Sequence, residues 1–142
     1  AYIAVIMKML DAIDKGENPK IMGDGSEAFD FVAVEDCAYA NVCAMKSDAV
    51  DRNYNVGTGV RTSLKELAEK LIAITKSKKP IEYVPSSQAT LVKNRIGDPR
   101  LASQHLGYKY EIDLDEGLRR LIDWRSTHKK EVEIRRKAVG VE

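Results

Sequence analysis

The chain has 142 residues, of which 44% are hydrophobic and 32% charged, and this balance excludes a disordered, collagen-like or disulfide-stapled chain. Its 23 basic residues nearly cancel its 22 acidic ones, and a formal net charge of +1 argues against polyanion binding as the main function. The longest apolar run, residues 1–7, ends at Lys8, which is too short for a membrane span, and it lacks the basic flank of a signal peptide. We therefore expect a soluble, cytoplasmic protein that forms one domain or part of a larger one.

The first predicted element is a helix over residues 3–13. Its apolar stripe has helical spacing and consists of Ile3, Ile6, Met7, Leu10 and Ile13. Tyr2, Val5 and Met9 make other faces apolar as well, and no capping residue stands in front of them. We expect a helix buried on more than one side, in a chain cut from a longer polypeptide. The extra face, with Tyr2, Val5, Ile6 and Met9, would then pack against the missing part or against a second copy in a homodimer.

Strands and a second helix are predicted next. The pattern indicates a strand over 20–22, a tight turn over 23–25, a half-buried strand over 29–34, and a helix that Glu35 or Asp36 opens and that runs to about Lys46. Cys37 and Cys43 lie six positions apart in that helix and face different directions, so they neither pair nor share a metal and are interpreted as small buried residues. The two histidines have no partner at metal-ligand spacing, and the sequence predicts no metal site.

The middle of the chain reads as a strand, a glycine turn, a helix and a strand. The strands are expected over 53–56 and 81–84, and the helix begins at Ser63, which forms a capping-box pattern with Glu66. A dinucleotide-binding loop has a similar outline, but Thr62 stands where its third glycine is needed, and the helix starts too late to meet a pyrophosphate. We interpret Gly57-Thr58-Gly59 as a turn at a strand end rather than as an NAD-binding loop.

The last third is predicted to be mainly helical. A polar connection over 85–93 leads to Asp98 and Pro99, a cap pair that opens a short helix ended by Gly107. Asp113 and Glu116 mark the start of a final helix whose core stripe is Leu114, Leu118, Leu121 and Ile122. The mixed charges from Lys129 onward are interpreted as a frayed, solvated helix end. The fold class is α/β or α+β, and no nucleophile and base pair with recognisable spacing is present, so the chain looks like a binding half.

Four motifs, in order along the chain, resemble one family. They are KIMGDGSEAFDFVAVED at 20–36, YNVGTG at 54–59 followed by SLKELAEKL at 63–71, RIGDPRLASQHLGY at 95–108 and LDEGLRRLIDW at 114–124. These segments resemble the C-terminal part of the extended short-chain dehydrogenases/reductases, the NAD-dependent sugar-nucleotide epimerases and dehydratases, and in particular their UDP-glucose 4-epimerase-like members. The resemblance implies a small mixed α/β substrate-binding region, the C-terminal part of a Rossmann-type protein.

The same resemblance implies that residues 1–142 lack the N-terminal Rossmann domain. That domain carries the NAD-binding loop and a Tyr-x-x-x-Lys catalytic set, and no tyrosine here has a lysine four residues later. We expect the fragment alone to be inactive and to bind no NAD, whereas the complete protein would oxidise a sugar carbon transiently with bound NAD and then epimerise or dehydrate the sugar. The alternative is a non-catalytic α/β interaction module whose first helix docks a partner.

The resemblance also implies which residues bind the nucleotide sugar. Lys20 and Met22 would lie beside the nucleobase, and Asn55 would point into the substrate cleft. Other interpretations stay open: Met22 could be a core residue, Asn55 could cap a turn, and Arg95, discussed next, could be a simple surface charge.

The phosphate site departs from the family pattern. Phe29 stands where the family commonly has the Arg of Arg-Asp-Phe, and residues 86–89 replace the stretch that usually holds the second arginine. Because a guanidinium is the natural partner of a diphosphate, we expect Arg95 to reach in from a shifted position, with Asp98 beside it.

Overall fold

The chain forms six helices and two small sheets in the described part of a computed structural model, which covers residues 5–85 and 93–138. The elements in order are α1 Val5–Asp14, β1 Lys20–Met22, β2 Ala28–Phe29, α2 Val34–Lys46, β3 Thr62–Ser63, α3 Leu64–Thr75, β4 Glu82–Val84, β5 Asn94–Arg95, α4 Arg100–Leu106, α5 Leu114–Thr127 and α6 Lys129–Ala138. The mixed α/β class expected from the sequence is confirmed.

Local capping chemistry sets the helix boundaries that the sequence predicts best. The Ser63 hydroxyl accepts a hydrogen bond from the Glu66 amide, and the Glu66 carboxylate accepts one from the Ser63 amide, so the predicted capping box of α3 is present. The Ser63 hydrogen bonds lower the pKa of Glu66. Gly107 ends α4 in the left-handed region with φ 68°, and Asp113 caps α5 by accepting from the Glu116 amide.

The sheets are short and mixed. β1 pairs in parallel with β4, and β2 lies between antiparallel β3 and parallel β5. The strand predicted over 29–34 is therefore wrong beyond Phe29: β2 ends there, and α2 already begins at Val34, before Glu35 or Asp36. Residues 53–56 form no strand either, because no described segment supplies the neighbour that a strand needs.

The main hydrophobic core lies where α1, α3 and the start of α5 meet. Its buried members are Met9, Leu10, Ile21, Leu64, Leu67, Ala68, Leu71 and Leu118. Burying each of the larger side chains contributes roughly 1.5–3 kcal/mol. Met9 is only 2% exposed within this chain, so the prediction that it faces another surface is wrong. Val5 and Ile6 pack partly buried at the edge of this core, and Tyr2 lies outside the described residues.

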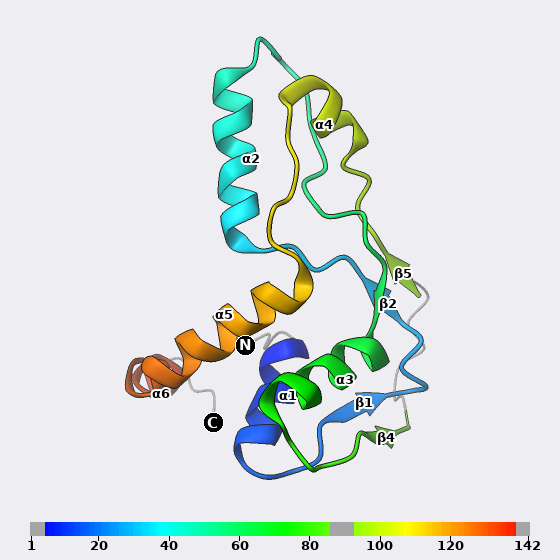
Figure 1. Cartoon of the computed structure of the whole chain (residues 1–142), viewed down its shortest axis with the longest axis vertical. Coiled ribbons are helices and arrows are strands. Elements are labelled where there is room, and N and C mark those ends of the chain that lie inside the picture. The colour runs from blue at the N-terminus through cyan, green and yellow to red at the C-terminus, as the bar shows by residue number, and fades with distance from the viewer. Residues whose placement is uncertain (1–4, 86–92, 139–142) are drawn as a thin grey trace.

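A second, smaller core joins α2 to α4 at the opposite end of the molecule (Figure 1). Ala40 of α2, Ala102 of α4 and Tyr108 are its buried members. Between the two cores the chain passes through β2 and β5 (Figure 1). The residues predicted to bind a ligand therefore fall mainly in the connecting region rather than in either core.

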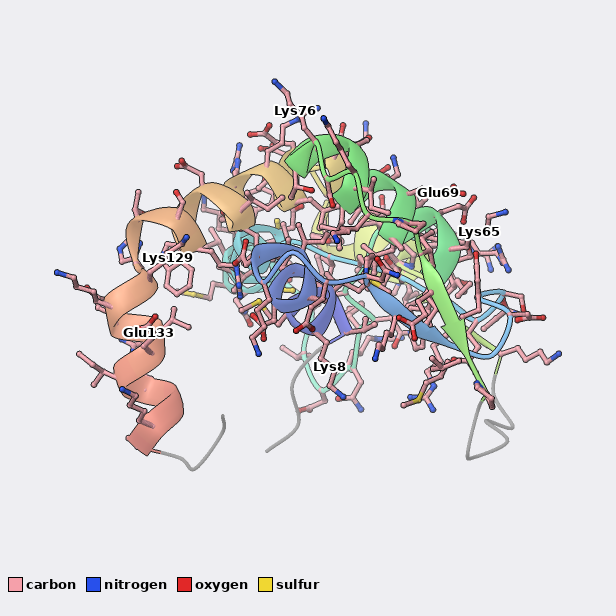
Figure 2. The ribbon with its side chains drawn as sticks, turned by 90° about the horizontal axis from the view of Figure 1, so that it is seen from below. Lys8, Lys65, Glu69, Lys76, Lys129 and Glu133 are labelled. Carbon is pink, nitrogen blue, oxygen red and sulfur yellow. The ribbon has the colours of Figure 1, made fainter. Side chains whose placement is uncertain are left out.

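The charged C-terminal segment is a separate helix rather than a frayed end of α5. The ring of His128 stacks on Trp124 with a centroid separation of 4.9 Å, and α6 starts at the next residue. Figure 2 shows α6, with Lys129 and Glu133, projecting from the body that α1, α3 and α5 form. In the described residues, no helix is both long and apolar enough to cross a bilayer.

Candidate functional site

Phe29 and Arg95 are direct register partners in the parallel pair β2–β5. Residues in register on neighbouring strands project to the same face of a sheet, so the aromatic ring and the guanidinium share one face. Phe29 is half-buried against the main core, whereas Arg95 is exposed. In the described part of the chain, Arg95 has no carboxylate within ion-pair distance, which leaves its guanidinium available to an anion.

The carboxylate of Asp30 organises the glycine turn beside this pair. It accepts hydrogen bonds from the Thr58 amide at 3.1 Å, the Thr58 hydroxyl at 2.5 Å and the Gly59 amide at 2.9 Å. A bound pyrophosphate would need the Thr58 and Gly59 amides as donors, but both already donate to the Asp30 carboxylate. The geometry of this turn does not suit a dinucleotide.

Two glycines allow the surrounding backbone to approach that carboxylate. A Cβ built on Gly57 would lie 2.5 Å from an Asp30 carboxylate oxygen, and one built on Gly97 would lie 3.2 Å from the same oxygen. The Gly57 position is closer than any real Cβ contact, so only glycine fits there without a rearrangement. Close approach explains Gly57, and neither this residue nor Gly97 has the positive φ that usually demands a glycine.

Tyr108 holds the same turn from the other side. Its hydroxyl donates to the Gly57 carbonyl at 3.2 Å, and the side chain is only 1% exposed. Burial, with the nearby negative charge of Asp36, raises the pKa of Tyr108 to about 12. The hydroxyl therefore stays protonated and able to donate at neutral pH.

Replacing Tyr108 with phenylalanine is expected to lower the free energy of unfolding by about 1–3 kcal/mol, because the Gly57 carbonyl loses its buried donor. The folded-state pKa lies above the unfolded value of about 10, so this residue's contribution is complete below pH 10 and is lost as the pH rises towards about 12. Denaturant unfolding of both proteins between pH 8 and 12 checks this, since the difference between them should shrink across that window. Tyr110→Phe, at a half-buried neighbour, is the control and should change little; an equal loss in both variants would contradict the prediction.

Asp36 is a second carboxylate that holds distant backbone amides, although its place in the sequence indicates only the start of a helix. It is 2% exposed and accepts hydrogen bonds from the amides of Glu111 at 2.9 Å and Ile112 at 3.1 Å. It thereby fixes the segment before α5 to α2. Its partners are 75 and 76 residues away, so no local pattern could have indicated them.

The remaining predicted site residues lie at two places. Lys20 and Met22 are on β1, where the Lys20 ammonium lies 3.8 Å from the Glu82 carboxylate and Met22 is 61% exposed, which argues against the core interpretation of Met22. Asp98 follows β5 and binds the Arg100 guanidinium at 2.6 Å, and these hydrogen bonds hold the pKa of Asp98 at about 2. The predicted cap pair is wrong by one residue: α4 begins at Arg100 with Pro99 as its N-cap, and Asp98, two residues before the helix, accepts from the Arg100 amide.

Asn55 is exposed and lies two residues before Gly57. Its side chain makes no hydrogen bond to another described residue, so the turn-cap interpretation has no partner in this part of the chain. The structure thus brings together Phe29, Arg95 and the turn that follows Asn55, while β1 stands in a separate sheet.

An apolar groove of about 750 Å³ lies between α1, the segment 30–35 and α5. Ile6, Phe31, Leu121 and the 42% exposed Trp124 are among its lining residues. Most of the groove lining is apolar, and its charged residues are Asp30, Glu35, Asp113 and Arg120. No cluster of three or more metal-ligating side chains occurs among the described residues.

The fold and the motifs on it define a class, the Rossmann-type extended short-chain dehydrogenases/reductases, whose C-terminal part this chain resembles. The GDP-mannose 4,6 dehydratase family model matches residues 2–121. The chain belongs to that family, and its relatives include UDP-glucose 4-epimerases and GDP-mannose 3,5-epimerases.

Individual relatives agree with this membership. A putative UDP-glucose 4-epimerase of Methanocaldococcus jannaschii is 35% identical over 128 residues, which cover 84% of this chain and 38% of that protein. The structure of UDP-glucose 4-epimerase from Thermotoga maritima with UDP-glucose matches with a TM-score of 0.81 and 30% identity, over 89% of this chain and 41% of the other. The enzyme WbmF of Bordetella bronchiseptica in complex with NADH matches with a TM-score of 0.78 and 26% identity, over 92% and 38%. The chain therefore spans about two fifths of the length of these relatives.

Proposed function

We propose that residues 1–142 form the C-terminal, nucleotide-sugar-binding part of an NAD-dependent sugar-nucleotide epimerase or dehydratase of the cytoplasm. The observation that carries the proposal is the Arg95 guanidinium, which has no ion-pair partner among residues 5–85 and 93–138 and shares a sheet face with Phe29 next to the Gly57 turn. A diphosphate gives up hydrating water when it binds, and this costs free energy unless a cation of the protein offsets it; Arg95 supplies that cation.

Each proposed ligand residue has a chemical role. Arg95 binds the diphosphate through a charge-assisted hydrogen bond, and Asn55 donates an amide hydrogen to phosphate or ribose. The exposed Met22 offers a polarisable surface to the nucleobase, and Lys20 lies on the same short strand. Asp98, held by Arg100, fixes the end of the segment that carries Arg95, and Phe29 leaves the site with one guanidinium fewer than the common family pattern.

NAD is held, in this proposal, by the remainder of the complete protein. The Gly57 turn is an unsuitable pyrophosphate site because its Thr58 and Gly59 amides donate to Asp30. The contribution of this chain is to bind the nucleotide end of the substrate, so that the sugar is oriented for reaction elsewhere in the protein. The apolar groove with Ile6 and Trp124 is where we expect the remainder of the protein to pack, since an exposed apolar surface of this kind favours association.

Titration calorimetry tests the proposal. The complete protein should bind UDP or GDP, whereas the 142-residue chain titrated with NAD should give no heat of binding. The choice between UDP and GDP is informative because relatives of both kinds, UDP-glucose 4-epimerases and GDP-mannose 3,5-epimerases, match this chain. Micromolar NAD binding by the isolated chain would contradict the proposal, as would a complete protein that binds no nucleoside diphosphate.

A further inference from the structure

Asp30 connects two segments through two different parts of the same residue. Its backbone amide donates to the Arg95 carbonyl at 3.0 Å, while its carboxylate takes three donors from Thr58 and Gly59. Asp30, which directly follows β2, thus fixes both the strand that bears Arg95 and the turn that follows Asn55. A carboxylate that accepts from three donors is held in place more firmly than one that makes a single exposed contact.

The two segments approach this residue in the same way. Gly57 comes two residues after Asn55, Gly97 comes two residues after Arg95, and a Cβ built on either glycine would meet the Asp30 carboxylate. The Cα of Gly57 would lie 3.9 Å from a Cβ placed on Gly97, so the two backbones converge beside the same oxygen. The position of Asn55 relative to Arg95 is therefore determined at Asp30.

We propose that Asp30 is a positioning residue for nucleotide binding, which sets the spacing of Asn55 and Arg95 without contacting the ligand. The inference rests on the proposed function, since it presumes that these two side chains bind the nucleoside diphosphate. Replacing the carboxylate by an amide removes the charge and leaves a single acceptor oxygen for the Thr58 and Gly59 donors, so the turn is held less firmly and the two ligand residues lose their alignment. Loss of this alignment weakens the contacts of both Asn55 and Arg95 with the nucleotide.

The test compares Asp30→Asn with Asp36→Asn in the complete protein. Asp36 is a suitable control because it is also a carboxylate that accepts backbone amides, but its partners are Glu111 and Ile112 rather than the turn. For Asp30→Asn we expect the Kd for the nucleoside diphosphate to rise by about 10-fold, the effect of losing roughly one hydrogen bond to a charged group. For Asp36→Asn we expect reduced stability with a Kd within about 2-fold of the wild type.

A double-mutant cycle separates positioning from a general structural role. If Asp30 acts through Arg95, the rise in Kd caused by Asp30→Asn should be smaller in an Arg95→Ala background than in the wild type. Equal effects in both backgrounds would overturn the inference. Should Asp30→Asn fail to fold, Thr58→Val removes the hydroxyl that donates to Asp30 and accepts from the Val60 amide, and it should still raise the Kd by about 3-fold.

The outcomes distinguish this inference from the proposed function. Wild-type binding of the nucleotide together with an unchanged Kd in Asp30→Asn, or in Thr58→Val, would overturn the inference and leave the function standing. A similar rise in Kd in Asp36→Asn would also overturn it, because the effect would then reflect lost stability. If the wild-type complete protein bound no nucleoside diphosphate, both would fall together.

Discussion

Replacing Arg95 with alanine is expected to weaken nucleotide binding by about 10- to 100-fold in the complete protein, with little change in kcat. The magnitude follows from the 1.5–3 kcal/mol of a charge-assisted hydrogen bond, at about 1.4 kcal/mol for each factor of ten. The Michaelis constant should rise with turnover preserved, because a contact to the nucleotide is made equally in the ground and transition states. Nucleotide titration and steady-state kinetics measure the two quantities separately.

Two further variants sharpen this prediction. Arg95→Lys keeps the charge but loses the planar fork of the guanidinium, so it should recover only part of the affinity. Arg119→Ala removes an exposed arginine from α5 and should leave the affinity unchanged. Wild-type affinity in Arg95→Ala would make Arg95 a surface charge and would remove the main support for the proposed phosphate site.

Replacing Gly57 with alanine is expected to lower the free energy of unfolding by about 1–3 kcal/mol, as overpacking does at a site that cannot relax freely. The new Cβ would lie 2.5 Å from Asp30 Oδ2, which already accepts hydrogen bonds from the Thr58 and Gly59 amides. Removing that oxygen should relieve the clash, so Gly57→Ala should cost less in an Asp30→Ala background. Denaturant unfolding of the four proteins measures the difference.

Gly117→Ala provides the matched control for this steric argument. Its Cβ would meet Ile112 at 3.7 Å, an ordinary contact, and the residue lies inside α5. Alanine in a helix is favoured over glycine by about 0.5–1 kcal/mol, so this variant should be more stable than the wild type. A destabilised Gly117→Ala, or a neutral Gly57→Ala, would show that the close approach at Asp30 does not decide the cost.

The helices could be predicted from the sequence because their signals are local. Ser63 and Glu66 are three residues apart, and Gly107 directly follows the helix that it ends. The strands were harder, since a strand exists only where a second segment supplies its hydrogen bonds. β1 was predicted with the observed bounds, whereas the strand expected over 29–34 ended at Phe29 and the strand expected over 53–56 did not form.

The residues of the candidate site could be predicted from the sequence, but the strand register and long-range hydrogen bonds that position them could not. The resemblance pointed to Phe29 and Arg95 separately, and the structure adds that they are register partners. Asp30 and Asp36 carry the long-range order, through contacts that span 28 or more residues. Their positions in the sequence resemble those of ordinary turn and helix-start residues, so no local pattern shows that their carboxylates bind distant backbone amides.

Met9 lies off the main apolar stripe of α1 but is buried within this chain. Its place off that stripe predicted contact with another surface instead. A short helix packed against α3 and beside α5 buries a wider arc than one stripe provides. The amount of apolar surface on a helix therefore indicates how much is covered, but not which chain covers it.

Residues 53–56 were expected to form a strand, and the structure shows none there. In the described part of the chain, their amides and carbonyls make no hydrogen bond to another segment, and Val56 is 37% exposed. A backbone segment without such partners can pair with an extended segment of another polypeptide, as in β-augmentation. For protein production, the consequence is that the isolated chain should associate through residues 53–56 as its concentration rises, and a charged substitution at Val56 should delay that self-association.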